Sequence, residues 1–412
     1  MNVSRVYFSE NMYLNHSAIN PLFNILYSLK LNTDLSSEYH FMDDGQAQLT
    51  FNRLMEHDKG AEVPELLKTD RPNIIFVILE SFGANIIEPL GGVKDVAPNM
   101  NKLTEEGIFF RNLYVSSFRT DRGIVATLGG YPAQPTMSIL KYPKKVQALN
   151  SIPKSLVDNG YSASFLYGGD VNFAQMKTFF VTQKVTDITT DTDFPIKDRL
   201  TKWGVPDAIT FEKFYEDIKN EQSKPYLKMF LTLSSHEPFD VPTKRFEEPF
   251  LNSVAYTDSC IGVFVDKLKS SPDWNNTLII FIPDHCMRYP KTVEYNEPER
   301  HQSFSLWIGG ALKDTLKIDK CCSQIDMVAT LLHQLHIDHK DFIFSKNVLN
   351  PTTKDFAFYS FSDGFGMLSD SSQVVYDNNS KQVIMSKGIH ADSLLLEGKA
   401  FLQYLYRDID SK

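Results

Sequence analysis

The stretch NIIFVILE, residues 73–80, is a continuous run of apolar residues, mostly β-branched, that ends in a carboxylate. A run of this kind and length is typical of a central parallel strand that is buried on both faces. The stretch TLIIFIP, residues 277–283, repeats the pattern and leads directly into Asp284 and His285. Two such strands at distant places in the chain predict a sheet that is mostly parallel.

Strand and helix patterns alternate through the middle of the chain. Further strands are predicted at residues 108–115, 161–167, 226–234 and 302–308. Helices are predicted at residues 98–106, 207–221, 251–269 and 324–335. Alternation of this kind indicates an α/β domain built on a parallel sheet.

The pattern changes towards both ends of the chain. Residues 1–70 carry short helical patterns within polar sequence and are expected to form an N-terminal arm. After residue 345, short strand patterns separated by Gly, Asn and Ser lead to a helical segment near the end. We therefore expect the arm, an α/β domain at residues 71–345, and a small C-terminal antiparallel β/α appendage at residues 346–412.

The overall charge narrows the range of partners. The chain of 412 residues carries 42 Lys and Arg against 51 Asp and Glu, a formal net charge of −9. Nucleic acids are bound by basic surfaces, so a nucleic-acid partner is not expected.

No apolar run approaches the roughly 18 residues of a membrane helix. The four cysteines form no CxxC pair, so neither a zinc ribbon nor a disulfide framework is indicated.

Two of the predicted strands end in the same way, with Glu80 after one and Asp284 and His285 after the other. Ligands of parallel sheets bind outside the carboxyl ends of the strands, so these side chains can meet at one edge. Two neighbouring carboxylates repel each other unless a cation lies between them. Two oxygens and an imidazole nitrogen suit Mn²⁺, Mg²⁺ or Zn²⁺. The alternative to a metal site is that Glu80 caps the following helix and that Asp284 and His285 belong to a polar loop.

The loop SSFRTDRG, residues 116–123, follows one predicted strand and precedes an apolar helical stretch. The N-terminus of a helix offers free N–H groups and a positive dipole end to an anion. Thr120 is either a helix cap or a nucleophilic hydroxyl activated by a metal. Arg119 and Arg122 bracket it and could neutralise a phosphoryl group, or they are solvated surface charges.

The order of these motifs resembles a known family. Glu-Ser-Phe-Gly after a strand is followed by Arg-Thr-x-Arg-Gly, then Ser-His-x-Pro-Phe, then Asp-His after a second strand. Residues 70–340 resemble the lipoteichoic acid synthase branch of the sulfatase superfamily, the phosphoglycerol transferases. The resemblance implies an alkaline-phosphatase-like three-layer sandwich and one divalent metal, Mn²⁺ before Mg²⁺ or Zn²⁺.

The resemblance also implies roles for individual residues. Glu80, Asp284 and His285 match the metal ligands, and Thr120 matches the nucleophile, which also touches the metal. His236, in the sequence SSHEPF, matches a histidine that contacts the phosphate or the leaving group.

Three further matches concern the substrate. Trp203 matches a Trp-Gly motif near the substrate, and His301 matches a histidine of related phosphoethanolamine transferases. The loop YGGD, residues 167–170, resembles Gly-Gly-Asp loops that border the family's site.

The chain also departs from the family pattern. Val205 and Pro206 stand where a phosphate-binding basic residue often follows the Trp-Gly motif, and Arg288 could substitute for it. The Cys/Ser-x-Pro-x-Arg motif of classical sulfatases is absent from the sequence, as is a second set of metal ligands. A true sulfatase and a two-metal phosphatase are therefore disfavoured.

These observations predict an enzyme that transfers phosphoglycerol from a phosphatidylglycerol-like lipid through a phosphothreonine. The alternatives are a sulfuric-ester or phosphodiester hydrolase of the same fold, and a non-catalytic domain that binds an anionic headgroup or a glycan. The opening segment, YFSENMYLNHSAINPLF, resembles the linker after the membrane helices of such proteins. We therefore expect a domain outside the bacterial inner membrane, facing the periplasm or the exterior and tethered through a membrane region that is absent here.

Overall fold

The structure is a computed structural model that describes residues 3–9, 11–23, 25 and 34–412. Its centre is a nine-stranded sheet in the order β4-β3-β5-β1-β6-β7-β2-β8, with β9 beside β2. These strands are β1 (Asn73–Leu79), β2 (Ile108–Tyr114), β3 (Ser162–Tyr167), β4 (Asp187–Thr189), β5 (Tyr226–Leu231), β6 (Thr277–Pro283), β7 (Gln302–Ile308), β8 (Leu316–Ile318) and β9 (Cys322–Ser323). Only β7 runs antiparallel to its neighbours β6 and β2, which confirms the predicted, mostly parallel sheet.

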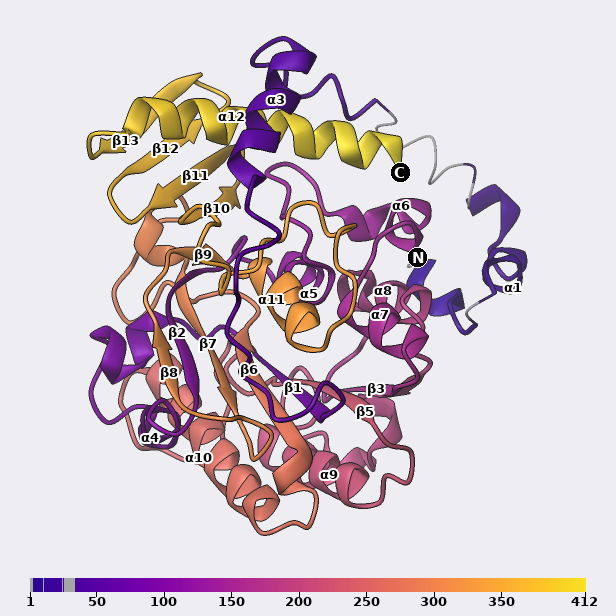
Figure 1. Ribbon diagram of the computed structural model, residues 1–412. Helices are drawn as coiled ribbons and strands as arrows, with labels where there is room; N and C mark the ends of the chain where they lie inside the picture. Colours follow the sequence, from indigo (N-terminus) through magenta and orange to yellow (C-terminus); the bar gives the residue numbers. More distant parts are fainter. Residues whose placement is uncertain (1–2, 10, 24, 26–33) are drawn as a thin grey trace.

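Alternate residues of each central strand enter two separate cores, because side chains point to opposite faces of a strand. In β1, Phe76 packs in one core and Val77 in the other. One face is covered by α4 (Pro98–Leu103), α9 (Asp207–Lys219) and α10 (Pro249–Lys269). The other face is covered by α5 (Thr120–Gly129), α7 (Ile152–Asp158), α8 (Met176–Thr182) and α11 (Asp326–Gln334). The result is the expected three-layer sandwich (Figure 1).

The C-terminal part forms a second, antiparallel sheet, as predicted. Its strands follow one another as β10 (Phe356–Phe361), β11 (Gly364–Ser369), β12 (Gln373–Asp377) and β13 (Gln382–Lys387). The helix α12 (Ala391–Ser411) packs against this sheet (Figure 1). The amide of Phe358 in β10 donates to Ser323 Oγ in β9 at 2.9 Å, so the two sheets meet edge to edge.

Part of the N-terminal region packs on the C-terminal helix. The helix α3 (Asp44–Met55) lies beside α12 (Figure 1). The buried side chain of Gln403 in α12 bonds to the backbone of Phe41 and Met42. The shorter helices are α1 (Met12–Ser17) and α6 (Pro143–Gln147). Every helix that the structure describes is too short or too polar to cross a bilayer.

Candidate active site

The metal-ligand candidates lie at the carboxyl ends of two neighbouring parallel strands. Leu79 at the end of β1 pairs with Pro283 at the end of β6, so Glu80 and Asp284 leave the sheet side by side. One ligand atom from each of Glu80, Asp284 and His285 lies within 4.8 Å of the other two. All three residues are buried. The predicted convergence of two carboxylates and an imidazole is therefore present.

The hydrogen bonds of this cluster leave room for a cation. Asp284 Oδ1 accepts from the amides of Ser81 and His285, at 3.0 and 2.7 Å, while Asp284 Oδ2 is buried without a hydrogen-bond partner. Burial and then the charge of Asp284 raise the pKa of Glu80 to about 8. A buried, partly unsatisfied acidic pair beside an imidazole is a costly arrangement for a protein without a counter-ion. The residues therefore fit a divalent metal with oxygen and nitrogen ligands.

Thr120 is the first residue of α5, and its hydroxyl points into the ligand cluster. Its Oγ1 donates to Glu80 Oε2 at 3.2 Å and lies 3.4 Å from His285 Nε2. The helix-cap position belongs to Arg119, whose side chain makes no capping bond. Thr120 is thus not a plain cap. Its hydroxyl and the helix N-terminus face the same acidic centre.

Close packing and one buried amide fix α5 against the end of β6. A Cβ on Gly123 would lie 2.3 Å from the backbone oxygen of Asp284, so only glycine allows this approach. The buried side chain of Gln324 donates to the backbone oxygens of Pro283 and Asp284, at 2.7 and 2.9 Å. It also donates a hydrogen bond to Thr127 Oγ1 in α5 at 2.9 Å. Sequence reasoning missed Gln324, because nothing in the helical pattern at 324–335 sets it apart.

His236 lies on the loop that follows β5 and faces the same space. Together with Glu80, Thr120 and His285 it lines a cavity of about 170 Å³. Its Nδ1 is 2.8 Å from the backbone oxygen of Glu237, which leaves Nε2 for a ligand. The ring of Trp203 packs on the His236 ring, with centroids 4.6 Å apart.

The other predicted substrate residues differ in their placement. Arg119 lines the cavity. Arg122 contacts Ser117 Oγ and the backbone oxygen of Pro135, both at 3.4 Å, and Arg288 lies over the ring of Tyr289. His301 is fully buried: its Nε2 is 2.8 Å from the oxygen of Tyr295, and its ring stacks on Tyr359. Arg122, Arg288 and His301 therefore do not line this cavity.

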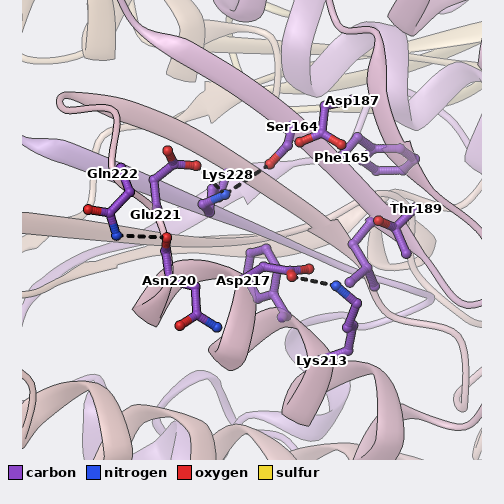
Figure 2. A pocket seen from close by; sticks show the side chains of 12 residues that line it. Ser164, Phe165, Asp187, Thr189, Lys213, Asp217, Asn220, Glu221, Gln222 and Lys228 are labelled. Carbon is purple, nitrogen blue, oxygen red and sulfur yellow. Dashed lines mark hydrogen bonds and ion pairs between the residues drawn. The ribbon is translucent and has the colours of Figure 1, made fainter.

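A separate polar cavity of about 370 Å³ lies under the β3–β4 edge of the sheet (Figure 2). The buried Lys228 points into it and forms an ion pair with Glu221 at 2.8 Å. Lys213 pairs in turn with Asp217 on the same helix. These two ion pairs leave one further carboxylate in the lining, that of Asp187, and the cavity shares no lining residue with the cavity at Thr120.

Comparison with known proteins agrees with this geometry. A family model described as sulfatase matches residues 72–337. The chain belongs to the sulfatase family. Lipoteichoic acid synthase 2 of Bacillus subtilis is 24% identical over 309 residues, 68% of this chain and 47% of the relative. Phosphoglycerol transferase I of Xanthomonas campestris is 22% identical over 311 residues, 70% of this chain and 44% of the relative.

Solved structures place this sulfatase-family chain in the alkaline phosphatase superfamily. A protein of that superfamily from Vibrio parahaemolyticus matches with a TM-score of 0.77 and 25% identity, covering 91% of this chain and 98% of the other. The lipoteichoic acid synthase LtaP of Listeria monocytogenes has the same fold, with a TM-score of 0.70, 17% identity, and coverage of 88% and 98%. The chain spans about half the length of the curated relatives it matches. Those relatives are enzymes, so the family-level class is enzymatic.

Proposed function

We propose that this sulfatase-family chain is the catalytic part of a metal-dependent phosphoglycerol transferase that acts on a phosphatidylglycerol-like lipid. The observation that carries the proposal is the position of the Thr120 hydroxyl, 3.2 Å from Glu80 Oε2 and 3.4 Å from His285 Nε2. The named relatives, lipoteichoic acid synthases and phosphoglycerol transferases, support the substrate class. We assign the chemistry to residues 71–345, between the arm and the C-terminal subdomain, and place it outside the cytoplasmic membrane.

The acidic cluster would hold the metal through Glu80, Asp284 and His285. A bound Mn²⁺, or Mg²⁺ or Zn²⁺, would supply positive charge that stabilises a threonine alkoxide and the phosphoryl oxygens. The hydrogen bond from Thr120 Oγ1 to Glu80 directs the hydroxyl proton towards the carboxylate of Glu80. The lone pairs of Oγ1 are thereby available to the phosphorus of the donor.

The transfer proceeds by two displacements. In the first, Thr120 Oγ1 bonds to phosphorus and the bond from phosphorus to the diacylglycerol oxygen breaks. Glu80 receives the proton of Thr120, and we assign His236 Nε2 as the donor of the proton that the leaving oxygen takes up. In the second, an acceptor hydroxyl oxygen bonds to phosphorus and the bond from phosphorus to Thr120 Oγ1 breaks. The acceptor's proton passes to His236, and the proton held by Glu80 returns to Oγ1. Arg119 and the N-terminus of α5 face the equatorial oxygens in both steps.

Threonine replacement tests the nucleophile. Phosphatidylglycerol vesicles with Mn²⁺ are incubated with wild type, Thr120→Ala and Thr120→Ser, and diacylglycerol release is measured. We expect Thr120→Ala to lose about 10⁴-fold or more, as removal of a nucleophile does elsewhere, and Thr120→Ser to retain part of the activity. Mass spectrometry is expected to find phosphoglycerol on Thr120 in the wild type. Full activity of Thr120→Ala would reject the assignment.

A parallel assay separates the related hydrolases. Chromogenic phosphate monoesters, phosphodiesters and sulfate esters are each tested with and without Mn²⁺. Faster turnover of the sulfate ester than of the diester would replace the transferase by a sulfuric-ester hydrolase. Absence of all turnover and of bound Mn²⁺ would favour a domain that only binds an anionic headgroup.

A further inference from the structure

His236 stands at the last position of a tight turn, residues 233–236, that follows β5. The amide of His236 donates to the oxygen of Leu233 at 3.0 Å, which closes the turn. The first three residues of the turn are buried, and only His236 is partly exposed. The direction of the His236 ring therefore depends on how the buried part of the turn is held.

A buried carboxylate from another element holds the first half of this turn. Asp207 is the first residue of α9 and is fully buried. Its Oδ1 accepts from the amide of Leu233 at 2.8 Å, and its Oδ2 accepts from the amide of Ser234 at 3.2 Å. The amide of Asp207 donates in return to Ser234 Oγ at 2.9 Å. The start of α9 and the turn are thus joined by hydrogen bonds in both directions.

A third element fixes the carboxylate of Asp207 itself. The hydroxyl of Thr257 in α10 donates to Asp207 Oδ2 at 2.6 Å. Burial raises the pKa of Asp207, and the hydrogen bonds from Thr257 and from the two amides oppose that rise. These partners all donate, which suits an ionised carboxylate, since it can only accept hydrogen bonds. The side chain is therefore a common anchor for α9, α10 and the turn.

The metal-ligand candidate Glu80 is held by separate hydrogen bonds to the same stretch of chain. Its amide donates to Thr232 Oγ1 at 2.9 Å, and Ser235 Oγ donates to its backbone oxygen at 2.6 Å. Asp207 takes part in neither bond. Removal of the contacts of Asp207 is therefore expected to loosen the turn while Glu80 keeps both of its bonds.

We propose that Asp207 is a positioning residue, which directs the ring of His236 into the cavity at Thr120 through its hold on residues 233 and 234. The proposal rests on the transferase function proposed above, in which His236 donates a proton to the leaving oxygen. A reacting group misplaced by about 1 Å can lower a rate by about 10²-fold. Asp207 therefore sets the rate of the displacements through His236 and leaves metal binding unchanged.

A double-mutant cycle tests this coupling. Asp207→Asn keeps the size of the side chain but turns an NH₂ group towards hydrogen-bond donors. Diacylglycerol release from phosphatidylglycerol vesicles at saturating Mn²⁺ is measured for the full chain, for Asp207→Asn, for His236→Ala and for the double variant. We expect Asp207→Asn alone to lower kcat by about 10–100-fold. In the His236→Ala background, the same change is expected to lower kcat by less than about twofold, because the ring that Asp207 directs is gone.

Asp258→Asn is the matched control. Asp258 on α10 is also fully buried, and it accepts from the amides of Asn99 and Met100 and from the side chain of Asn99, at 2.8–3.0 Å. It holds the start of α4 in the way that Asp207 holds the turn. Asp258→Asn is expected to lower stability in urea unfolding and to leave kcat unchanged. Both variants are expected to keep the Mn²⁺ affinity of the wild type in titration.

The His236 ring also gives a signal that does not depend on activity. Selective ¹⁵N-labelling of histidine yields ring resonances by NMR, and His236→Ala assigns the resonance of His236. We expect this resonance to shift in Asp207→Asn and to stay in place in Asp258→Asn. If Asp207→Asn does not fold, Thr257→Val removes one donor to the carboxylate. It is expected to shift the same resonance and to lower kcat by about threefold, the loss for one hydrogen bond.

The opposite results would overturn the positioning role of Asp207. They are an equal loss of kcat from Asp207→Asn with and without His236, or an equal loss in Asp258→Asn. A fall in Mn²⁺ affinity that parallels the fall in kcat overturns it as well, as does an unmoved His236 resonance in the folded variants. If the wild type releases no diacylglycerol, the proposed function fails, and the His236 resonance alone decides whether Asp207 positions the ring.

Discussion

Replacement of Gln324 by leucine removes the side chain that ties the metal-ligand strand to the helix of Thr120. The Gln324 amide donates to the backbone oxygens of Pro283 and Asp284, and to Thr127 Oγ1. Its Oε1 accepts from the amide of Ser116, at 3.1 Å, in the loop that leads to α5. Leucine has a similar size, so it keeps the packing and removes all of these bonds.

The expected cost follows from the groups that lose their partner. Two buried backbone oxygens and one buried amide are left unsatisfied, while the Thr127 hydroxyl can rotate. Each unsatisfied buried group costs about 1–3 kcal/mol, so for three groups we expect a loss of about 3–9 kcal/mol in unfolding free energy. The backbone of Asp284 also loses its support. Loss of a group that holds a metal ligand in place by hydrogen bonds lowers metal affinity by about 10–100-fold, and we expect Gln324→Leu to lower the Mn²⁺ affinity by that factor.

Urea unfolding and Mn²⁺ titration measure the two effects separately. Gln334→Leu is the matched control, because Gln334 is also buried and bonds to the backbone of Pro64 and Leu66 away from the site. It is expected to lose stability without losing Mn²⁺ affinity. If Gln324→Leu and Gln334→Leu bind Mn²⁺ equally well while both are folded, the positioning role of Gln324 is refuted.

Three further predictions concern packing, charge and pH. Gly123→Ala places a Cβ against the backbone of Asp284. The free energy of unfolding is expected to fall by about 1–3 kcal/mol, and Mn²⁺ binding is expected to weaken. Gly129→Ala, where the nearest atom to the added Cβ is 3.5 Å away, is expected to leave the Mn²⁺ titration unchanged. Lys346→Met strands the buried carboxylate of Asp326, its ion-pair partner, and is expected to cost about 3–5 kcal/mol in urea unfolding. Burial lowers the pKa of His301 to about 3. The stability that neutral His301 contributes is therefore full above about pH 6.5, its ordinary pKa, and is lost as pH falls towards 3. The free energy of unfolding is expected to be lower by about 2 kcal/mol at about pH 5. His301→Gln is expected to flatten this part of the dependence of unfolding free energy on pH.

Contradicting results are equally specific. Unchanged Mn²⁺ affinity in Gly123→Ala would mean that α5 can move away from Asp284 without consequence. A Lys346→Met variant as stable as the wild type would mean that Asp326 takes up a proton at little cost. An identical pH profile for His301→Gln and the wild type would mean that His301 titrates normally in the fold.

The sequence by itself determined the central sheet and the core of the site. Continuous apolar runs such as residues 73–79 can only be buried on both faces of a sheet, so strand positions followed from composition. Glu80, Asp284 and His285 follow such runs directly, and Thr120 opens a helix after another strand. Parallel strands present their carboxyl ends at one edge, so the sequence predicted that these four residues meet there, and their side chains lie together in the structure.

The tertiary structure alone decided which way the remaining side chains point. Arg119 and Arg122 are alike in sequence, yet only Arg119 reaches the cavity, because the following turn of α5 carries Arg122 towards Pro135. His301 is adjacent to a strand end but is buried against Tyr359, which comes from the second sheet. Gln324 gained its role from segments far away in the chain. Local sequence cannot encode such contacts, because they depend on how separately folded elements pack together.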